Sequence, residues 1–187
     1  MTTVEFKGKQ AAIIPEGVFI IGTYDENGIP NAMNAAWGSQ SDFGEMTLFL
    51  AHHKTTENIQ KTKAFTVAFA TKSTVKIADY FGVETGFKVN KIEKAGCHVH
   101  KSRYVNAPVI EEFPVTLACR MKSYDEESGI LVGEIIAQQA KEDVLTNGMI
   151  DYDKLQPIIF DISSKTYRVI GPVVGRAYHE GLKLKKQ

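Results

Sequence analysis

The chain has little cysteine, no leader-like start and no long apolar run. Cys97 and Cys119 are its two cysteines among 187 residues, too few for a secreted disulfide framework. The first five residues, MTTVE, lack the charged-then-apolar pattern of a signal peptide. No apolar run approaches the roughly 20 residues that cross a bilayer. These absences predict a cytoplasmic protein that has no membrane partner.

The chain also has no excess of charge of either sign. Its 22 Lys and Arg balance 22 Asp and Glu, so the broad basic footprint of a nucleic-acid binder is missing. Only residues 183–186 (KLKK) are basic, and a short charged terminus is more often a solvated tail than a binding arm. The sequence therefore predicts no nucleic-acid partner.

What is present is an ordinary globular composition. The chain is 43% hydrophobic and 24% charged, close to the average soluble protein. A chain of this length can bury roughly two thirds of its unfolded surface without disulfides or metal. No internal repeat, low-complexity tract or linker divides it, so we expect one domain over residues 1–187.

The first third of the chain has the pattern of β-hairpins. Residues 17–24 are β-branched and aromatic, and the turn residues 25–28 (DENG) follow them. Residues 30–37 would be the return strand of this hairpin, and residues 46–51 a third, more buried strand.

Helical signals then alternate with strands. Thr55 or Thr56 can cap a short helix through residues 57–60, after which residues 64–70 return to a strand pattern. Ser73 is a plausible cap for a second helix that ends at Gly82. Residues 84–108 have no sustained period, so we expect a loop with short helical turns there.

The second half of the chain also favours antiparallel strands. Residues 115–122 alternate apolar and polar, and the acidic turn 125–129 leads into residues 130–137, which predicts a second hairpin. Residues 157–160 and 167–170 are short strand candidates. About seven strands joined by turns favour a mainly β, mostly antiparallel barrel over a Rossmann sheet.

Residues 51–59 (AHHKTTENI) join a buried strand to a helix start. The first amides of a helix lack intrahelical partners and attract an anion, and Lys54, Thr55 and Thr56 would add a charge and two hydroxyl donors. This segment can hold a phosphate. By itself it fits an ordinary capped surface helix better, because threonine caps are common.

Residues 31–38 (NAMNAAWG) are rich in small side chains. They would let a planar ring approach the backbone, while Asn34 supplies a side-chain donor and Trp37 an apolar wall. By itself this segment fits a core strand better. An anion site and a ring-edge site together are what a phosphorylated heterocycle requires.

Two histidine-containing segments carry weaker signals. Cys97, His98 and His100 resemble metal ligands, but a fourth ligand has no obvious source, so we predict no metal site. His52 and His53 would point to opposite faces of an extended chain, and one of them could line the phosphate pocket while the other is solvated. Met33 and Met46 more plausibly fill the core than contact a ligand.

In four stretches, the sequence resembles the flavin reductase-like FMN-binding split barrels, in particular their flavoredoxin-type members. The stretches are residues 15–18 (PEGV), 27–37 (NGIPNAMNAAW), 54–59 (KTTENI) and 79–86, in which DYFG leads to Thr85 and Gly86. The closing residues 170–178 (IGPVVGRAY) look similar too. The likeness covers most of the chain from about residue 15, and the ordered combination is more specific than any one piece.

The resemblance implies a split barrel with a few short helices, a homodimer, and FMN bound near the subunit interface. Carried over by position, the residues that face the ring would be Asn34, Ala35, Ala36 and Trp37. Those at the ribityl phosphate end would be Lys54, Thr55, Thr56 and Asn58, with His53 beside them. Lys88, and Tyr178 or His179, could also approach the flavin.

The resemblance further implies an FMN-dependent oxidoreductase that passes electrons from NAD(P)H or a redox protein to an acceptor. The flavin would carry the chemistry, so no catalytic acid or base is obligatory, and none is predicted. The chain has no G-x-G-x-x-G, so a nicotinamide donor would bind without a Rossmann turn. The alternative function is a flavin-binding or sensing barrel without turnover.

Overall fold

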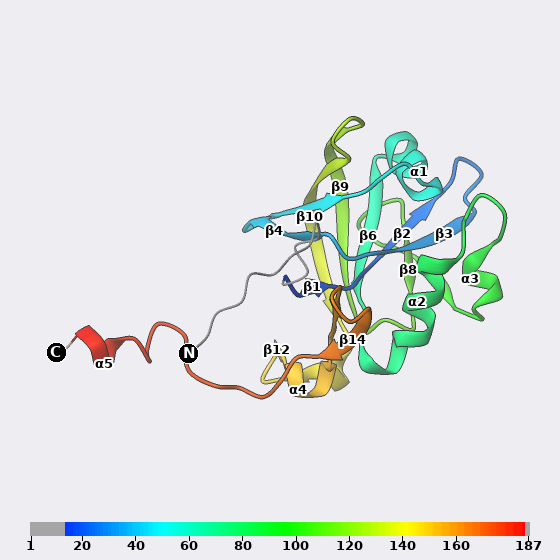
Figure 1. The fold of residues 1–187 in the computed structure, drawn as a ribbon. Helices are drawn as coiled ribbons and strands as arrows, with labels where there is room; N and C mark the ends of the chain where they lie inside the picture. The colour runs from blue at the N-terminus through cyan, green and yellow to red at the C-terminus, as the bar shows by residue number, and fades with distance from the viewer. Residues whose placement is uncertain (1–13, 186–187) are drawn as a thin grey trace.

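The computed structural model describes residues 14–185, and its main feature is a curled antiparallel sheet of seven strands (Figure 1). The strand order is β3-β2-β6-β9-β10-β5-β4, and each neighbouring pair is antiparallel. This arrangement confirms the predicted mainly β split barrel. The strands are β2 (Phe19–Tyr24), β3 (Pro30–Ala35), β4 (Gly38–Asp42), β5 (Glu45–Phe49), β6 (Ala64–Phe69), β9 (Val115–Asp125) and β10 (Ile130–Ala140).

Smaller elements surround this sheet. A three-stranded sheet and two short hairpins lie beside the barrel, and five short α-helices and two 3₁₀ turns complete the described chain. The small strands are β1 (Glu16–Gly17), β7 (Val99–Lys101), β8 (Pro108–Ile110), β11 (Leu145–Thr146), β12 (Met149–Ile150), β13 (Ile158–Asp161) and β14 (Thr166–Val169). The helices are α1 (Lys54–Thr62), α2 (Val75–Val83), α3 (Lys91–Lys94), α4 (Tyr152–Leu155) and α5 (Leu182–Lys185), and the 3₁₀ turns are Lys72–Thr74 and Glu142–Val144.

Both predicted hairpins are present. β2 pairs with β3 and β9 with β10, each through a turn that needs a glycine. Gly28 (φ +77°) and Gly129 (φ +71°) have left-handed backbone, which a residue without Cβ adopts at little cost. The short strands at 157–160 and 167–170 are confirmed as β13 and β14, which pair with each other.

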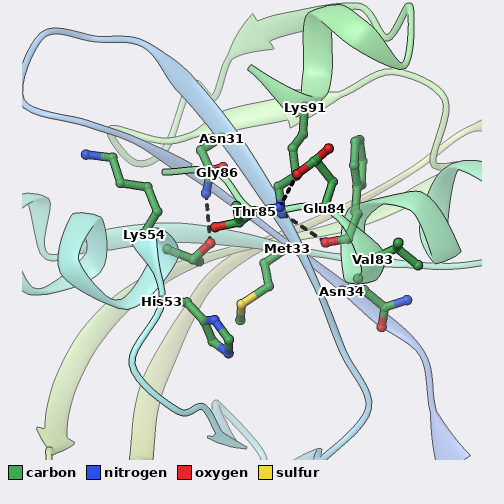
Figure 2. Close-up of a pocket in the computed structure, with 13 residues that line it drawn as sticks. Asn31, Met33, Asn34, His53, Lys54, Val83, Glu84, Thr85, Gly86 and Lys91 are labelled. Atoms are coloured by element: carbon green, nitrogen blue, oxygen red, sulfur yellow. Dashed lines mark hydrogen bonds between the residues drawn. The ribbon is translucent and has the colours of Figure 1, made fainter. Parts of the chain in front are cut away.

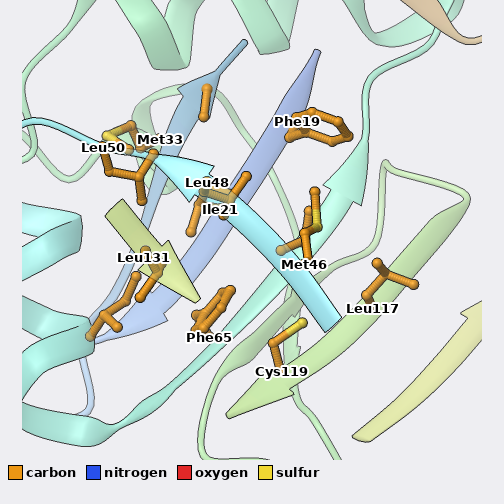
Figure 3. Close-up of a cluster of buried hydrophobic side chains, with 13 residues drawn as sticks. Phe19, Ile21, Met33, Met46, Leu48, Leu50, Phe65, Leu117, Cys119 and Leu131 are labelled. Carbon is orange, nitrogen blue, oxygen red and sulfur yellow. The ribbon is translucent and has the colours of Figure 1, made fainter. Parts of the chain in front are cut away.

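The barrel encloses one apolar core, and a second core lies outside it. Phe65, Ile21 and Leu48 are fully buried in the first core, which Figure 3 shows between β2, β5, β6, β9 and β10. Alternate residues of the same strands, such as Ile20 and Ala68, point outward and pack with α2, α3 and β8. Both faces of β2 and β6 are therefore buried, and this explains why their sequences are apolar almost throughout.

β4 is the main element that the sequence pattern does not predict. Its residues, GSQSD, have no apolar alternation and are mostly exposed. The strand pairs with β5, the next strand in the chain, across the two-residue turn Phe43-Gly44, so a polar segment is held as an edge strand by its hairpin partner. The return strand predicted over residues 30–37 correspondingly ends at Ala35, where the chain bends into β4. The described residues contain fourteen strands against about seven predicted; besides β4, the additional ones are β1, β7, β8, β11 and β12, each only two or three residues long.

The second predicted helix has different ends. A 3₁₀ turn begins after Thr71, whose N–H donates to Thr74 Oγ1 (2.9 Å), so the predicted Ser73 cap is wrong. The helix continues through Gly82 to Val83, and the residue after it, Glu84, is extended. Residues 84–108 are loop with the short elements α3 and β7, largely as expected.

Among the described residues, no helix has both the length and the apolar character needed to span a membrane.

Candidate functional site

Helix α1 begins two or three residues earlier than the threonines predict. Its N-cap is His53, so the expected caps Thr55 and Thr56 lie inside the first turn. Thr56 Oγ1 accepts from His53 N–H (2.8 Å) and donates to the His53 carbonyl (2.8 Å), which commits this hydroxyl to the helix start. The amides of Lys54 and Thr55 remain at the first turn, where intrahelical partners are lacking.

The start of α1 lines a cavity of about 230 Å³, called here the central cavity (Figure 2). Three segments that are far apart in the sequence form its walls: strand β3, the start of α1, and the chain that leaves α2. The lining residues are Asn31, Met33, Asn34, His53, Lys54, Thr55, Phe81, Gly82, Val83, Glu84, Thr85, Gly86 and Lys91.

Two further cavities share walls with the central cavity. One, of about 250 Å³, shares Asn31, Lys54 and Gly86 with it and is called the lysine cavity because Lys88 also lines it. The other, of about 660 Å³, shares Asn34, Gly82 and Val83 and is called the open cavity. The central cavity therefore lies between the other two, and the three follow one another as a run from Lys88 past Lys54 to Asn34.

A buried lysine faces the central cavity. Lys91 is 3% exposed, and its Nζ donates to the Phe81 carbonyl (2.9 Å). Burial lowers the pKa of Lys91 to about 8, while the carboxylate of Glu84 acts in the opposite direction. Burial also lowers the pKa of His53, and the nearby Lys91 and His52 charges add to this effect. The cavity is therefore lined by Lys54, Lys91 and a histidine that is held towards its neutral form.

Buried amide–hydroxyl pairs fix α1 against the sheet. Asn31 Nδ2 donates to Thr55 Oγ1 (2.8 Å), which joins β3 to the first turn of α1. Asn58 Nδ2 donates to Thr23 Oγ1 (3.0 Å), which joins the next turn to β2. All four residues are at least nine-tenths buried, so these bonds position the cavity walls rigidly.

The side chain of Asn34 is held between two elements. Its Nδ2 donates to the Ala78 carbonyl of α2 (2.8 Å), so one of the two N–H donors expected to face a ring edge is already used. Tyr167, which also lines the open cavity, donates to Asp79 Oδ1 (2.7 Å). Burial, followed by this bond, raises the pKa of Tyr167 to about 12, which keeps the phenol protonated.

Gly86 sits where the cavity wall leaves no room for a side chain. A Cβ at this position would lie against the Asn31 side-chain oxygen, well inside van der Waals contact. Glycine here lets the loop after α2 approach β3 closely and close the cavity between them.

The structure brings together some of the residues predicted for the site. Asn34, His53, Lys54 and Thr55 line the central cavity, Ala36 lines the open cavity with Asn34, and Asn58 and Lys88 line the lysine cavity with Lys54.

Other predicted residues lie outside these three cavities. Ala35 faces the barrel core, Thr56 is buried at the helix start, and Trp37 is 57% exposed. Tyr178 and His179 lie on the segment after β14, which leaves the body on the side away from α1, α2 and α3 (Figure 1).

Sequence reasoning missed several residues of the central cavity as site residues. Asn31, Glu84 and Lys91 come from β3, the loop after α2, and α3. The polar Asn31 within a strand of small residues is a signal that could have identified it. Lys91 gave no signal, because lysine is usually exposed and only the tertiary packing buries it.

The two histidines beside Cys97 are paired with carboxylates. His98 Nδ1 lies 3.0 Å from Glu112 Oε1, and His100 Nδ1 lies 3.1 Å from Glu111 Oε1. Within residues 14–185, no group of three or more His, Cys, Asp or Glu side chains is placed to hold a metal ion. Burial raises the pKa of Cys97 to about 12, so its thiol stays protonated.

The comparison with protein families identifies the class. Residues 11–158 match the flavin reductase like domain, which is well over half of the chain. The chain therefore belongs to the flavin reductase-like family.

Solved structures agree with this assignment. The flavoredoxin of Desulfovibrio vulgaris (Miyazaki F) is 27% identical, with a TM-score of 0.91 over 96% of this chain and 100% of that one. The flavoredoxin from Methanosarcina acetivorans is 28% identical, with a TM-score of 0.87 over 98% of this chain and 100% of that one.

A match among curated proteins is less informative. An uncharacterized protein of Aquifex aeolicus (strain VF5) is 28% identical over 107 residues, which cover 56% of this chain and 55% of that relative. The chain thus spans about half the length of the curated relative that it matches.

Proposed function

We propose that the chain binds FMN along the run of three cavities and works as a flavin-dependent oxidoreductase. One observation carries this proposal: the start of α1, expected to attract an anion, and strand β3, expected to approach a ring, line the same cavity through Lys54, Thr55 and Asn34. Asn34 and Lys54 are 20 positions apart in the sequence, and each was identified from its own local segment. That both line one cavity is therefore a separate observation, which neither segment predicted. Membership of the flavin reductase-like family supports the same ligand.

The phosphate end fits the side of the run nearest Lys54. The free amides at the start of the nine-residue helix α1 attract a phosphate, and Lys54 and Lys88 add positive charge from two sides. One hydrogen of the Asn58 amide already donates to Thr23, so its second hydrogen and its Oδ1 are what it can offer to a ligand. Thr55 retains its hydroxyl proton for a ligand, since its oxygen accepts the bond from Asn31.

The ring end fits the side of the run towards Asn34 and Ala36. One hydrogen of the Asn34 amide nitrogen is bonded to α2, so its second hydrogen, its Oδ1 and the neighbouring backbone are the groups left to bond a ring edge. Val83 and Phe81 supply apolar wall, and Gly82 keeps that wall close to β3. The ring would thus be held by backbone groups and apolar contacts.

When bound, FMN supplies hydride and one-electron transfer through its isoalloxazine. The residues of this chain hold and orient it, exclude water from one of its faces, and set the charge around it. Lys91 is the buried residue best placed to set the charge around the flavin, because the Phe81 carbonyl fixes it and it faces the central cavity. A positive charge near the ring favours the more anionic reduced state, so Lys91 would raise the reduction potential.

The electron donor is proposed to be NAD(P)H or a redox protein, and the working form a homodimer. The open cavity adjoins the central one through Asn34, Gly82 and Val83 and is wide enough for a second reactant to approach the ring. Phe160 and Ile162 supply apolar surface there, and Lys165 supplies a positive charge.

A flavin titration tests the proposal in two steps. Protein stripped of flavin is titrated with FMN, and the expected result is a shifted flavin absorption spectrum with one FMN per chain. Anaerobic addition of NADH or NADPH to the loaded protein should then bleach the flavin absorption. A chain that binds no FMN overturns the proposal, whereas binding without bleaching by either nicotinamide or a reduced redox protein leaves a flavin-binding barrel without turnover.

A further inference from the structure

The segment that follows β14 makes no part of the barrel. Residues 170–185, called here the arm, leave the body in an extended path and end in the short helix α5 (Figure 1). Every side chain of the arm that the structure describes is exposed. Three apolar side chains stand out: Val173 is 87% exposed, Val174 99% and Tyr178 101%. A row of fully exposed apolar side chains signals a surface that is covered in the working protein.

The body carries a matching apolar patch. Phe49 of β5 pairs with Ile130 of β10, and Phe49 N–H donates to the Trp37 carbonyl (2.9 Å), so these residues lie side by side on three neighbouring chain segments. Phe49 and Ile130 point away from the barrel core, because their neighbours Leu48 and Leu131 point into it. Trp37 is 57% exposed and Phe49 49%. Trp37, Phe49 and Ile130 form what is called here the Trp37 patch.

Charge is divided between the arm and the body. From residue 170 to the end the sequence contains four Lys and Arg against one Glu, and residues 1–169 contain eighteen Lys and Arg against twenty-one Asp and Glu, so the two parts carry +3 and −3. The turn Asp125, Glu126 and Glu127 lies directly beside the patch, because Asp125 pairs with Ile130. A basic, apolar arm therefore complements an apolar patch with an acidic border.

We infer that the arm of one copy covers the Trp37 patch of a second copy, and that two copies exchange their arms reciprocally. A neutral chain with a positive arm and a negative body complements itself, which a twofold dimer requires. The inference rests on the proposed homodimer and specifies the surface that holds it together.

The first test is a cross-link between two variants of the full chain that each add one cysteine. Phe49→Cys and Val174→Cys are purified separately, mixed, oxidised and weighed by mass spectrometry. Cys119 is buried and burial raises the pKa of Cys97 to about 12, so the natural thiols give little background. The expected product is a covalent dimer with one chain of each variant. The matched control is Tyr104→Cys, which is 51% exposed and outside the patch, mixed with Val174→Cys.

The second test measures the dimer itself by sedimentation. The double variant Val173→Asp, Val174→Asp should raise the dimer dissociation constant at least about tenfold. It removes two apolar side chains that would be buried on the Trp37 patch, and it places two carboxylates beside the acidic border of that patch. Tyr104→Asp should leave it unchanged.

Several outcomes would overturn the inference. They are a full-length chain that stays monomeric, an arm variant that dimerises normally, a cross-link as strong with Tyr104→Cys, and an intrachain disulfide in a monomeric Phe49→Cys, Val174→Cys double variant. Flavin binding is measured separately on each variant. A cross-linked dimer that binds no FMN overturns the proposed flavin function and leaves the arm exchange intact.

Discussion

The barrel interior is filled by apolar side chains, whereas the walls of the central cavity bury polar and charged ones. Phe65, Leu48 and Ile21 fill the interior and contribute no polar side-chain atom. The cavity walls bury Asn31, Thr55 and Lys91, each almost completely hidden from solvent. The interior gains free energy from apolar burial, whereas the walls bury a lysine at a cost that shows in its lowered pKa.

This difference separates what folds the chain from what a ligand would use. A buried lysine is costly unless something compensates it, and in this structure the Phe81 carbonyl is its one hydrogen-bond acceptor among the described residues. An anion or an electron-rich ring in the cavity would supply the remaining compensation for the buried charge of Lys91. Changes in the interior should therefore alter stability alone, and changes in the walls should alter ligand affinity.

The largest effect is expected from the interior. Phe65 is fully buried between the strands, and Gly133 lies so close to its ring that a Cβ there would collide with it. Phe65→Ala should lower the free energy of unfolding by about 3–5 kcal/mol, measured by denaturant titration. Phe43→Ala, at a side chain 97% exposed, should change it by less than about 0.5 kcal/mol. A similar loss in both variants would contradict the assignment of the core.

The next effect is expected at the bond between β3 and α1. Asn31→Ala leaves the buried Thr55 hydroxyl without its donor and should lower the free energy of unfolding by about 1–3 kcal/mol. It should also weaken FMN binding several-fold, because the start of α1 is no longer fixed against β3. Thr66→Val removes another buried hydrogen bond, from Thr66 Oγ1 to the Pro108 carbonyl, between residues that line none of the three cavities. It should lower stability similarly while leaving FMN affinity intact. Equal losses of affinity would sink the distinction.

A smaller effect is expected from the phosphate end. Lys54→Ala should raise the dissociation constant for FMN about tenfold, because one charge near the phosphate is lost. Riboflavin lacks the phosphate, so its affinity should not change. Lys101→Ala, at an exposed lysine of β7, serves as the control. Isothermal titration with both flavins distinguishes a phosphate contact from a general loss of binding, which would affect riboflavin as well.

The smallest effect is expected from pH. Between pH 7 and 9 Lys91 loses its proton, since its pKa is about 8, and FMN affinity should fall a few-fold. Bound FMN would shift the midpoint of Lys91 deprotonation to higher pH, because the ligand stabilises the charged amine.

The stability of the flavin-free protein should move the other way. The unfolded lysine, with a pKa near 10.4, binds more protons than the native one between about pH 8 and 10. The contribution of Lys91 to stability therefore rises with pH in this window. In Lys91→Met both trends should disappear, and a pH dependence of affinity that persists there would assign it to another group.

Local sequence patterns predicted most of the barrel. The two hairpins follow from apolar strands with turns ending in Gly28 and Gly129, and these signals lie within a few residues of each other. β4 was missed because its residues, GSQSD, are polar and lack the apolar alternation of a strand, although they pair with β5 across a two-residue turn. The start of α1 was misplaced because the hydroxyl of Thr56 caps it from inside the helix.

The candidate site was predicted in part. Lys54 and Asn34 were identified separately, and the resemblance to a family joined them. That Ala35 faces the core and Trp37 lies exposed follows from the bend between β3 and β4, which no local pattern encodes. The position of a residue relative to that bend decides which way its side chain points.

By itself, the sequence determined the class of fold, the hairpins, and two segments suited to an anion and to a planar ring. Those properties depend on residues near one another in the chain. Only the tertiary structure decided that the two segments line one cavity, that Lys91 is buried beside them, and that the arm is left without a surface of its own. These depend on contacts between distant residues, whose free energy exists only once the sheet has closed around its core.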